Sequence, residues 1–127
     1  MKINKKDPPR TFEVGIDQST VLSDCGEVYL EPNEQVTFKT HSEGEYDFVR
    51  KDWGFYASPS LNSRLLKFNL RAVLVKNVTS KHYYILVVER GKEASFDLYC
   101  DTEHLKVVVW MDNQESLDNL SNYNLVT

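Results

Sequence analysis

The stretch RKDWGFYASPSLNSRL, residues 50–65, brings aromatic, hydroxyl, amide and basic side chains together in one short segment. Aromatic faces can stack on a sugar or a nucleoside base, while hydroxyl, amide and guanidinium groups orient the polar atoms of a ligand. The residues that we predict to bind a ligand are Tyr56, Ser58, Ser60, Asn62 and Arg64. A purely structural corner of a small fold is the alternative interpretation, because aromatic residues also fill cores.

Both interpretations can hold if the two faces of this extended segment have different roles, one in the core and one in ligand binding. Successive side chains of an extended segment point to opposite faces, so Trp53 and Phe55 share one face and Tyr56 lies on the other. Pro59 disfavours helix just before it and keeps this segment extended. We therefore expect Trp53 and Phe55 to fill the core, and Tyr56 with the polar residues after it to line a surface groove.

The chain contains the residue types of nucleophilic catalysis but not their patterns. Its thiols and imidazoles are Cys25, Cys100, His41, His82 and His104. No spacing marks a triad, there is no GxSxG elbow, and the glycines are scattered singly rather than gathered in a phosphate-binding loop. The sequence favours a binding protein over an enzyme.

The segment LEPNEQVTFKTHSEGEYDF, residues 30–48, resembles the first motif of the cupins, in which a Pro-led turn precedes a strand with two metal-binding His and a later Glu. The resemblance implies that His41 and Glu45 take the places of one His and that Glu. His82 would add a further ligand for iron or manganese. Lys39 stands in place of the other His, and a protonated lysine cannot bind a metal. We expect no metal and no other cofactor, with a degenerate cupin-like enzyme acting on a sugar as the alternative function.

Length and charge limit the classes of protein. A chain of 127 residues suits one compact domain that needs neither metal nor disulfide to fold. The net charge of -4, with both signs interspersed, offers no basic face for nucleic acid. All apolar runs are shorter than the roughly 20 residues of a membrane span, so we expect a cytoplasmic protein that does not enter a membrane. Its two cysteines should stay reduced there.

The N-terminal half predicts an arm followed by antiparallel strands. Residues 1–10 are polar and contain a Pro pair, which favours a flexible arm, and residues 11–127 should form a single α+β domain. Apolar and polar residues alternate along the next short segments, which is typical of antiparallel strands with one wet face. We expect a half-sandwich or a partly open barrel, with strands at residues 11–15, 27–31, 35–40 and 45–50.

The C-terminal half predicts the order β-β-α-β-α. Residues 70–75 and 83–88 are apolar runs joined by a turn-like segment, and residues 105–111 form a further run. Strands that are apolar on both faces must be covered on both. We therefore predict that residues 83–88 and 105–111 are the central strands, and that Val108→Asp unfolds the protein.

Two helices should accompany these strands. Residues 91–100 have Phe96, Tyr99 and Cys100 at helical spacing. Residues 112–120 form the last helix, with Asp112 and Glu115 as a capping box at its start.

Several segments resemble one group of small bacterial proteins of unassigned activity, whose genes are often found among those for surface-polysaccharide and sugar-nucleotide biosynthesis. These segments are DCGEVYLEPNEQVTF, EYDFVRKDWGFYASPSLNSRL, LRAVLVKN, LVVERGKEASFDLY and VVVWMDN, within residues 24–113. The resemblance implies a small cytoplasmic binding or adaptor protein whose partner is a saccharide, a nucleotide-sugar or a partner enzyme. It assigns no catalytic residue. Self-assembly through the long apolar strands, including a homodimer, is a further alternative.

Overall fold

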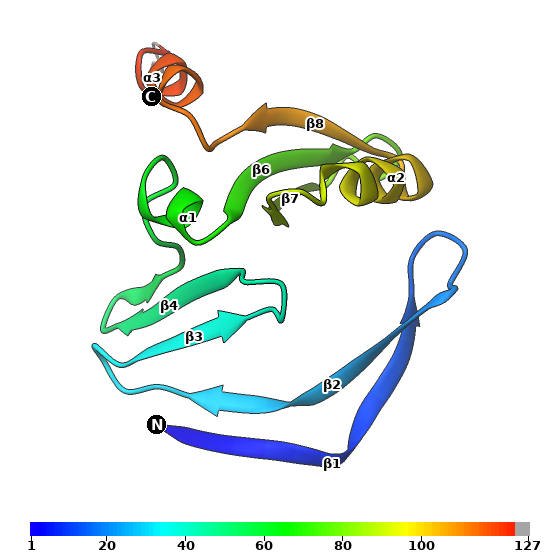
Figure 1. The fold of residues 1–127 in the computed structure, drawn as a ribbon. Helices are drawn as coiled ribbons and strands as arrows, with labels where there is room; N and C mark the ends of the chain where they lie inside the picture. Colours follow the sequence, from blue (N-terminus) through cyan, green and yellow to red (C-terminus); the bar gives the residue numbers. More distant parts are fainter. Residues whose placement is uncertain (124–127) are drawn as a thin grey trace. The chain divides into compact units, whose positions relative to one another are not determined.

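The computed structural model describes residues 1–123 and combines helices with antiparallel sheets (Figure 1). This mixed class confirms the coarse expectation, while the half-sandwich or barrel arrangement stays a prediction. The chain divides into two compact units. The single domain expected over residues 11–127 stays a prediction. Unit 1 comprises Met1–Val36 and Phe48–Tyr56, and unit 2 comprises Thr37–Asp47 and the chain from Ala57 onward.

Unit 1 contains a two-stranded antiparallel ribbon. Its strands are β1 (Lys2–Val14) and β2 (Thr20–Tyr29), with Lys2 opposite Tyr29 at one end and Val14 opposite Thr20 at the other. Residues 2–10, expected as a flexible arm, instead belong to β1, because their backbone pairs with β2 on both sides of a register shift. The Pro pair lies within this shift, where no ladder hydrogen bond is needed.

A glycine shapes the ribbon at the same place. Gly26 lies opposite Lys5 with a φ of +146°, a conformation that L side chains rarely adopt. A Cβ atom at Gly26 would also collide with the backbone oxygen of Asn4. The close approach of the two strands beside the register shift therefore requires glycine.

The second sheet has the strand order β3-β4-β5, with β3 at Gln35–Lys39, β4 at Glu45–Lys51 and β5 at Gly54–Tyr56. The boundary between the units crosses β3 and β4. Trp53 lies in the two-residue turn between β4 and β5 and is 69% exposed. Phe55 is also exposed and packs on Phe48, with ring centroids 4.9 Å apart. The prediction that Trp53 and Phe55 fill the core is wrong, because both side chains are more than half exposed. The tight turn between β4 and β5 directs Trp53 outward.

The sheet of unit 2 has the order β7-β6-β8, and its neighbouring strands are antiparallel. These strands are β6 (Leu70–Asn77), β7 (Tyr83–Glu89) and β8 (Leu105–Trp110). The central strand is β6, so the prediction that β7 and β8 are central is wrong. A hairpin places β7 on one side of β6, and the helix α2 (Glu93–Glu103) carries the chain across to the other side. Val108 is 49% exposed, so Val108→Asp is no longer expected to unfold the protein.

The core of unit 2 lies on both faces of β6. On one face of β6, Val73 and Val75 form a buried cluster with Val88 of β7 and with Phe96 and Cys100 of α2. The other face contacts the short helix α1 (Arg64–Lys67) and carries a second cluster of Leu65, Leu70 and Ala72. Full burial of one large apolar side chain is worth about 1.5–3 kcal/mol, so these clusters hold unit 2 together.

The last helix, α3 (Gln114–Ser121), begins one residue later than the predicted cap implies. Asn113 is the N-cap, and its side-chain oxygen accepts a hydrogen bond of 2.8 Å from the backbone N–H of Ser116. Asp112 instead accepts a hydrogen bond of 2.5 Å from Nε of Arg71, so the predicted capping box is wrong. Among the helices of residues 1–123, none has the length and apolar character that crossing a membrane requires.

Candidate ligand-binding site

Glu89, the last residue of β7, connects three elements of unit 2. Its carboxylate accepts hydrogen bonds from the hydroxyls of Thr40 and Ser42, which belong to the β3–β4 turn, the latter over 2.6 Å. The ammonium of Lys92, at the start of α2, lies 3.5 Å from the same carboxylate. The hydroxyls of Ser42 and Thr40, and then Lys92, hold the pKa of Glu89 below its usual value. Glu89 is therefore a firmly ionised group at neutral pH.

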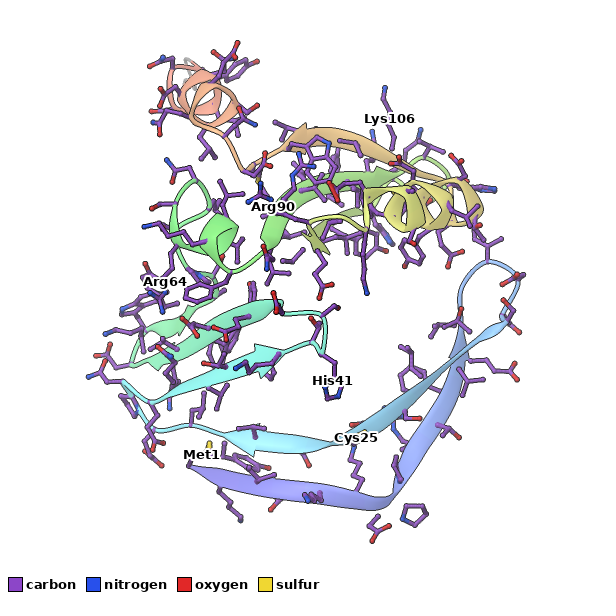
Figure 2. All side chains as sticks on the ribbon, in the orientation of Figure 1. Met1, Cys25, His41, Arg64, Arg90 and Lys106 are labelled. Atoms are coloured by element: carbon purple, nitrogen blue, oxygen red, sulfur yellow. The ribbon has the colours of Figure 1, made fainter. Side chains whose placement is uncertain are left out.

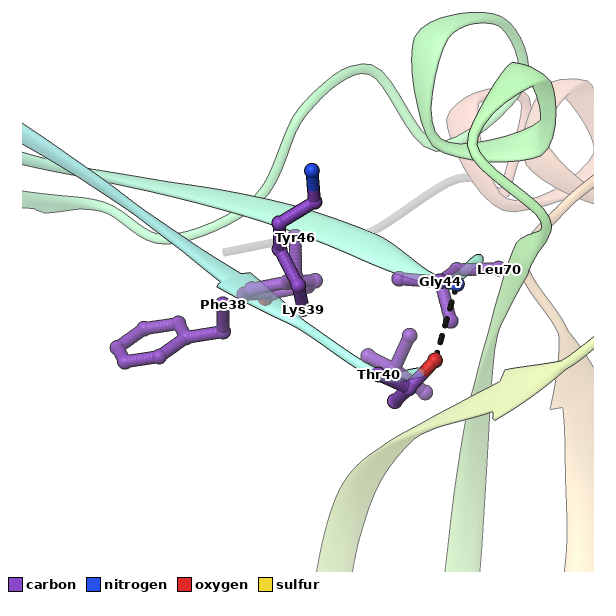
Figure 3. Close-up of a pocket in the computed structure, with 7 residues that line it drawn as sticks. Phe38, Lys39, Thr40, Gly44, Tyr46 and Leu70 are labelled. Carbon is purple, nitrogen blue, oxygen red and sulfur yellow. Dashed lines mark hydrogen bonds between the residues drawn. The ribbon is translucent and has the colours of Figure 1, made fainter. Parts of the chain in front are cut away.

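Gly44 lets the β3–β4 turn approach this carboxylate. Its backbone N–H donates to Oγ1 of Thr40 over 3.0 Å, which closes the turn (Figure 3). A Cβ atom at Gly44 would lie 2.8 Å from Oε1 of Glu89 and 3.2 Å from the side chain of Leu70. A larger residue would push the turn away from β7.

A cavity of about 520 Å³ opens beside Glu89, between the turn, β7 and α2. Its charged and hydroxyl side chains are Thr40, Ser42, Glu89, Lys92 and Ser95. Its apolar and aromatic lining consists of Leu86, Val87, Val88, Phe96 and Tyr99. The volume is in the range of small-molecule sites, and the half-exposed Tyr99 ring offers an accessible aromatic surface. We call this cavity the Glu89 cavity.

Two further cavities adjoin the same turn. One, of about 260 Å³, is drawn in Figure 3 and is lined by Phe38, Lys39, Thr40, Gly44, Tyr46, Leu70 and Val87. The other, of about 590 Å³, is lined by Lys39, Thr40, His41, Glu43 and Glu45. Because Thr40 lines all three cavities, the surface of unit 2 is hollowed on several sides of this turn.

The polar residues predicted from the sequence to bind a ligand make bonds within the protein. Oγ of Ser60 accepts from the backbone N–H of Arg64 over 2.8 Å, at the start of α1. The guanidinium of Arg64 lies 3.1 Å from the carboxylate of Asp47. Ser58 is half-buried, and its hydroxyl donates to the backbone oxygen of Pro59 over 2.8 Å. A ligand at these groups would have to compete with these contacts.

Asn62 and Tyr56 complete that predicted set. The amide of Asn62 donates to the side-chain oxygen of Gln114 over 2.7 Å and so connects the α1 region to α3. Tyr56 is exposed, as expected, but belongs to unit 1, whereas the other four residues belong to unit 2. Their joint role in binding stays a prediction.

The alternative metal ligands are not gathered together. His41 projects from the β3–β4 turn (Figure 2), and Glu45 forms an ion pair of 2.9 Å with Lys39. The turn contacts β7 at Glu89, whereas His82 precedes the opposite end of that strand, about 20 Å away at the usual rise per residue. Within residues 1–123 no three His, Cys, Asp or Glu side chains lie close enough to hold a metal ion.

The described lining of the Glu89 cavity consists of carboxylate, ammonium, hydroxyl, apolar and aromatic side chains. The lowered pKa of Glu89 keeps its carboxylate ionised near neutral pH, where it can accept hydrogen bonds. No sequence pattern marks this site, because Tyr99 has the helical spacing of the core residues Phe96 and Cys100, and because Glu89 belongs to no motif.

Comparisons of this chain with protein-family models, with curated proteins and with solved structures find no match.

Proposed function

We propose that this chain is a small binding protein whose ligand is a saccharide, or the sugar part of a nucleotide-sugar, held in the Glu89 cavity. The observation that carries the proposal is the composition of the lining, which combines an ionised carboxylate, an ammonium, hydroxyls and an accessible aromatic ring in one hollow. A sugar ring has an apolar C–H face and a rim of hydroxyls. The Tyr99 ring matches the face, while Glu89 accepts from hydroxyls and Lys92 donates to them.

The proposal includes an adaptor role in the cytoplasm, where the bound sugar compound would be passed to or sensed by a partner enzyme. Both cysteines are free thiols, Cys25 exposed and Cys100 buried, which suits a reducing compartment. Burial raises the pKa of Cys100 and keeps it protonated. The resemblance to proteins of polysaccharide gene groups guides the choice of ligands to test.

The proposal is tested by isothermal titration calorimetry with neutral sugars, uronic acids and nucleotide-sugars. We expect saturable binding of at least one compound, and an affinity about tenfold lower in Tyr99→Ala, because loss of an aromatic stacking surface costs about 1 kcal/mol or more. Leu98→Ala is the matched control, since Leu98 is an exposed neighbour on α2 outside the lining. Equal affinity of Tyr99→Ala and the wild type, or no binding of any compound, would contradict the proposal.

A further inference from the structure

Among residues 1–123, no strand pairs with the outer edge of β7, and the backbone groups of this edge can be assigned from the hydrogen bonds of β7 to β6. The backbone N–H of Asn77 donates to the oxygen of His82, and that of Arg90 donates to the oxygen of Asn69. Both pairs follow the β6–β7 register, in which hydrogen-bonded pairs alternate with pairs that point outward. The N–H and C=O groups of Tyr83, Ile85 and Val87 therefore point away from β6.

This edge lacks the features that usually prevent strands of different molecules from pairing. Native edges carry charged side chains, prolines or bulges. From Tyr83 to Val88 the strand has no charged residue, no proline and an unbroken register. The opposite edge, β8, has a charged Lys106 and a register irregularity where β6 passes from Leu74 to Val75. Only β7 of these two edges is open to strand addition.

The side chains of the free edge are apolar and exposed. Tyr83 is 56% exposed, Tyr84 45% and Ile85 58%. A whole aromatic side chain can bury about 150–250 Å², so the exposed halves of the two tyrosines present on the order of 200 Å² per molecule. Stable interfaces bury about 1,200–2,000 Å² in total. A strand pairing here has the size of a weak, reversible interface.

A second copy of this chain matches the edge. In an antiparallel pair with a two-fold axis beside Leu86, Ile85 lies opposite Val87 of the partner subunit, and the outward groups of both strands meet. Every facing side chain between Tyr84 and Val88 is then apolar. Lys81 precedes the strand and Glu89 ends it, so antiparallel pairing brings the basic end of one copy toward the acidic end of the other. Parallel pairing would place like charges together.

We infer that two copies of this protein associate in solution through antiparallel pairing of their β7 strands, which joins two three-stranded sheets into one six-stranded sheet. The pairing shares Leu86, Val87 and Val88 with the lining of the Glu89 cavity, so the association is measured on the protein without added sugar. Its expected dissociation constant is in the micromolar range or weaker, which follows from the small apolar area.

Sedimentation velocity over about 10 μM to 1 mM tests the inference. We expect a monomer–dimer equilibrium that Ile85→Lys weakens at least tenfold, because it puts a charge on the exposed edge. Val108→Lys is the matched control on the β8 edge and should change the dissociation constant less than twofold. A wild-type monomer at every concentration would overturn the inference, as would a dimer weakened by Val108→Lys but not by Ile85→Lys.

A proline pair separates backbone pairing from side-chain packing. Ile85→Pro removes an outward N–H, so it should abolish the dimer while the far-ultraviolet circular dichroism spectrum stays that of the wild type. Leu86→Pro removes an N–H that binds β6 and should disrupt the fold itself. A folded Ile85→Pro variant that dimerises like the wild type would show that the association does not use β7 backbone groups.

Discussion

The two units of this protein are alike in backbone pairing and differ in packing. Both buried hydrophobic clusters of residues 1–123 lie in unit 2, one on each face of β6. Unit 1 has a long strand pair, yet its large apolar side chains, such as Ile3, Val28 and Trp53, are exposed. A two-stranded ribbon alone is marginally stable in water. The contrast teaches that regular hydrogen bonding gives unit 1 its shape, whereas the core gives unit 2 its stability.

Polar contacts reinforce the difference. In unit 1, Lys6 forms an ion pair of 2.5 Å with Asp24 near the surface, where solvent weakens it. In unit 2, Arg71 bonds to Asp112 over 2.5 Å and lies 3.9 Å above the ring of Trp110. Asp112 is largely shielded from solvent, so its contact with Arg71 joins β6 to the start of α3 in a less polar environment.

The largest effect should come from a charge placed in the core of unit 2. Val73 is fully buried, so Val73→Asp should lower the free energy of unfolding by more than about 4 kcal/mol, because the carboxylate has no partner there. Val28→Asp, on the exposed ribbon, should cost about 1 kcal/mol or less. Thermal melts followed by circular dichroism measure both variants. A similar loss in both would break the contrast between the units.

Next in size is the loss of the Arg71 contacts. Arg71→Ala should cost about 2 kcal/mol, less than a fully buried pair because Arg71 is a quarter exposed. Arg64→Ala serves as the control, since the exposed Arg64 also binds a carboxylate and lies over the ring of Phe68. That variant should cost within about 1 kcal/mol by urea unfolding. An equal loss of unfolding free energy in Arg71→Ala and Arg64→Ala would contradict the expectation that the more buried ion pair contributes more.

Acid should weaken unit 2 through Asp112. Desolvation alone would raise the pKa of Asp112, but hydrogen bonds from Arg71 and Asn113 lower the net value below that of the unfolded chain, which is about 4. The pair therefore adds stability that is complete above about pH 4 and is lost as the pH falls through the lower pKa of the folded state. Urea unfolding at several pH values should show a steeper loss for the wild type than for Asp112→Asn. Identical slopes would contradict this assignment.

The smallest effect should come from Trp53. Because this side chain lies in an exposed turn, Trp53→Ala should change the free energy of unfolding by about 0.5 kcal/mol or less. Burial of a core aromatic would instead give about 3–5 kcal/mol. Tryptophan fluorescence offers a second measurement, since exposed Trp53 should be quenched by iodide. A large destabilisation would show that Trp53 is covered in solution.

Local patterns in the sequence predicted where strands and helices occur, but they did not predict which elements lie next to one another in the fold. The apolar runs at residues 70–75 and 83–88 mark β6 and β7, because long Val, Leu and Ile runs favour strands. The apolar character of these runs could not show which strand is central in the sheet. Strand β6 is central because a hairpin places β7 on one side of it and a helical crossover places β8 on the other. At α3, Asp112 and Asn113 are both good caps, and the distant Arg71 decides between them by binding Asp112.

Local sequence patterns could not predict the candidate site either, because its residues are far apart in the sequence. Thr40 and Ser42 are 49 and 47 positions from Glu89, and only the fold brings their hydroxyls to its carboxylate. By contrast, Ser60 and Asn62 looked suited to a ligand because polar residues stood near aromatic ones. The Ser60 hydroxyl instead accepts from the backbone N–H of Arg64, and the Asn62 amide donates to Gln114 of α3. A sequence pattern cannot distinguish such internal hydrogen bonds from ligand binding.

Residue-resolved NMR of backbone amides during titration with the tightest-binding saccharide tests most directly that the ligand site lies in the Glu89 cavity. We predict saturable shift changes that are largest at Thr40, Ser42, Glu89, Lys92 and Tyr99, with the β1–β2 ribbon unchanged. Largest changes at Tyr56, Ser58, Ser60, Asn62 and Arg64 would contradict this account and return the site to the segment that the sequence first suggested.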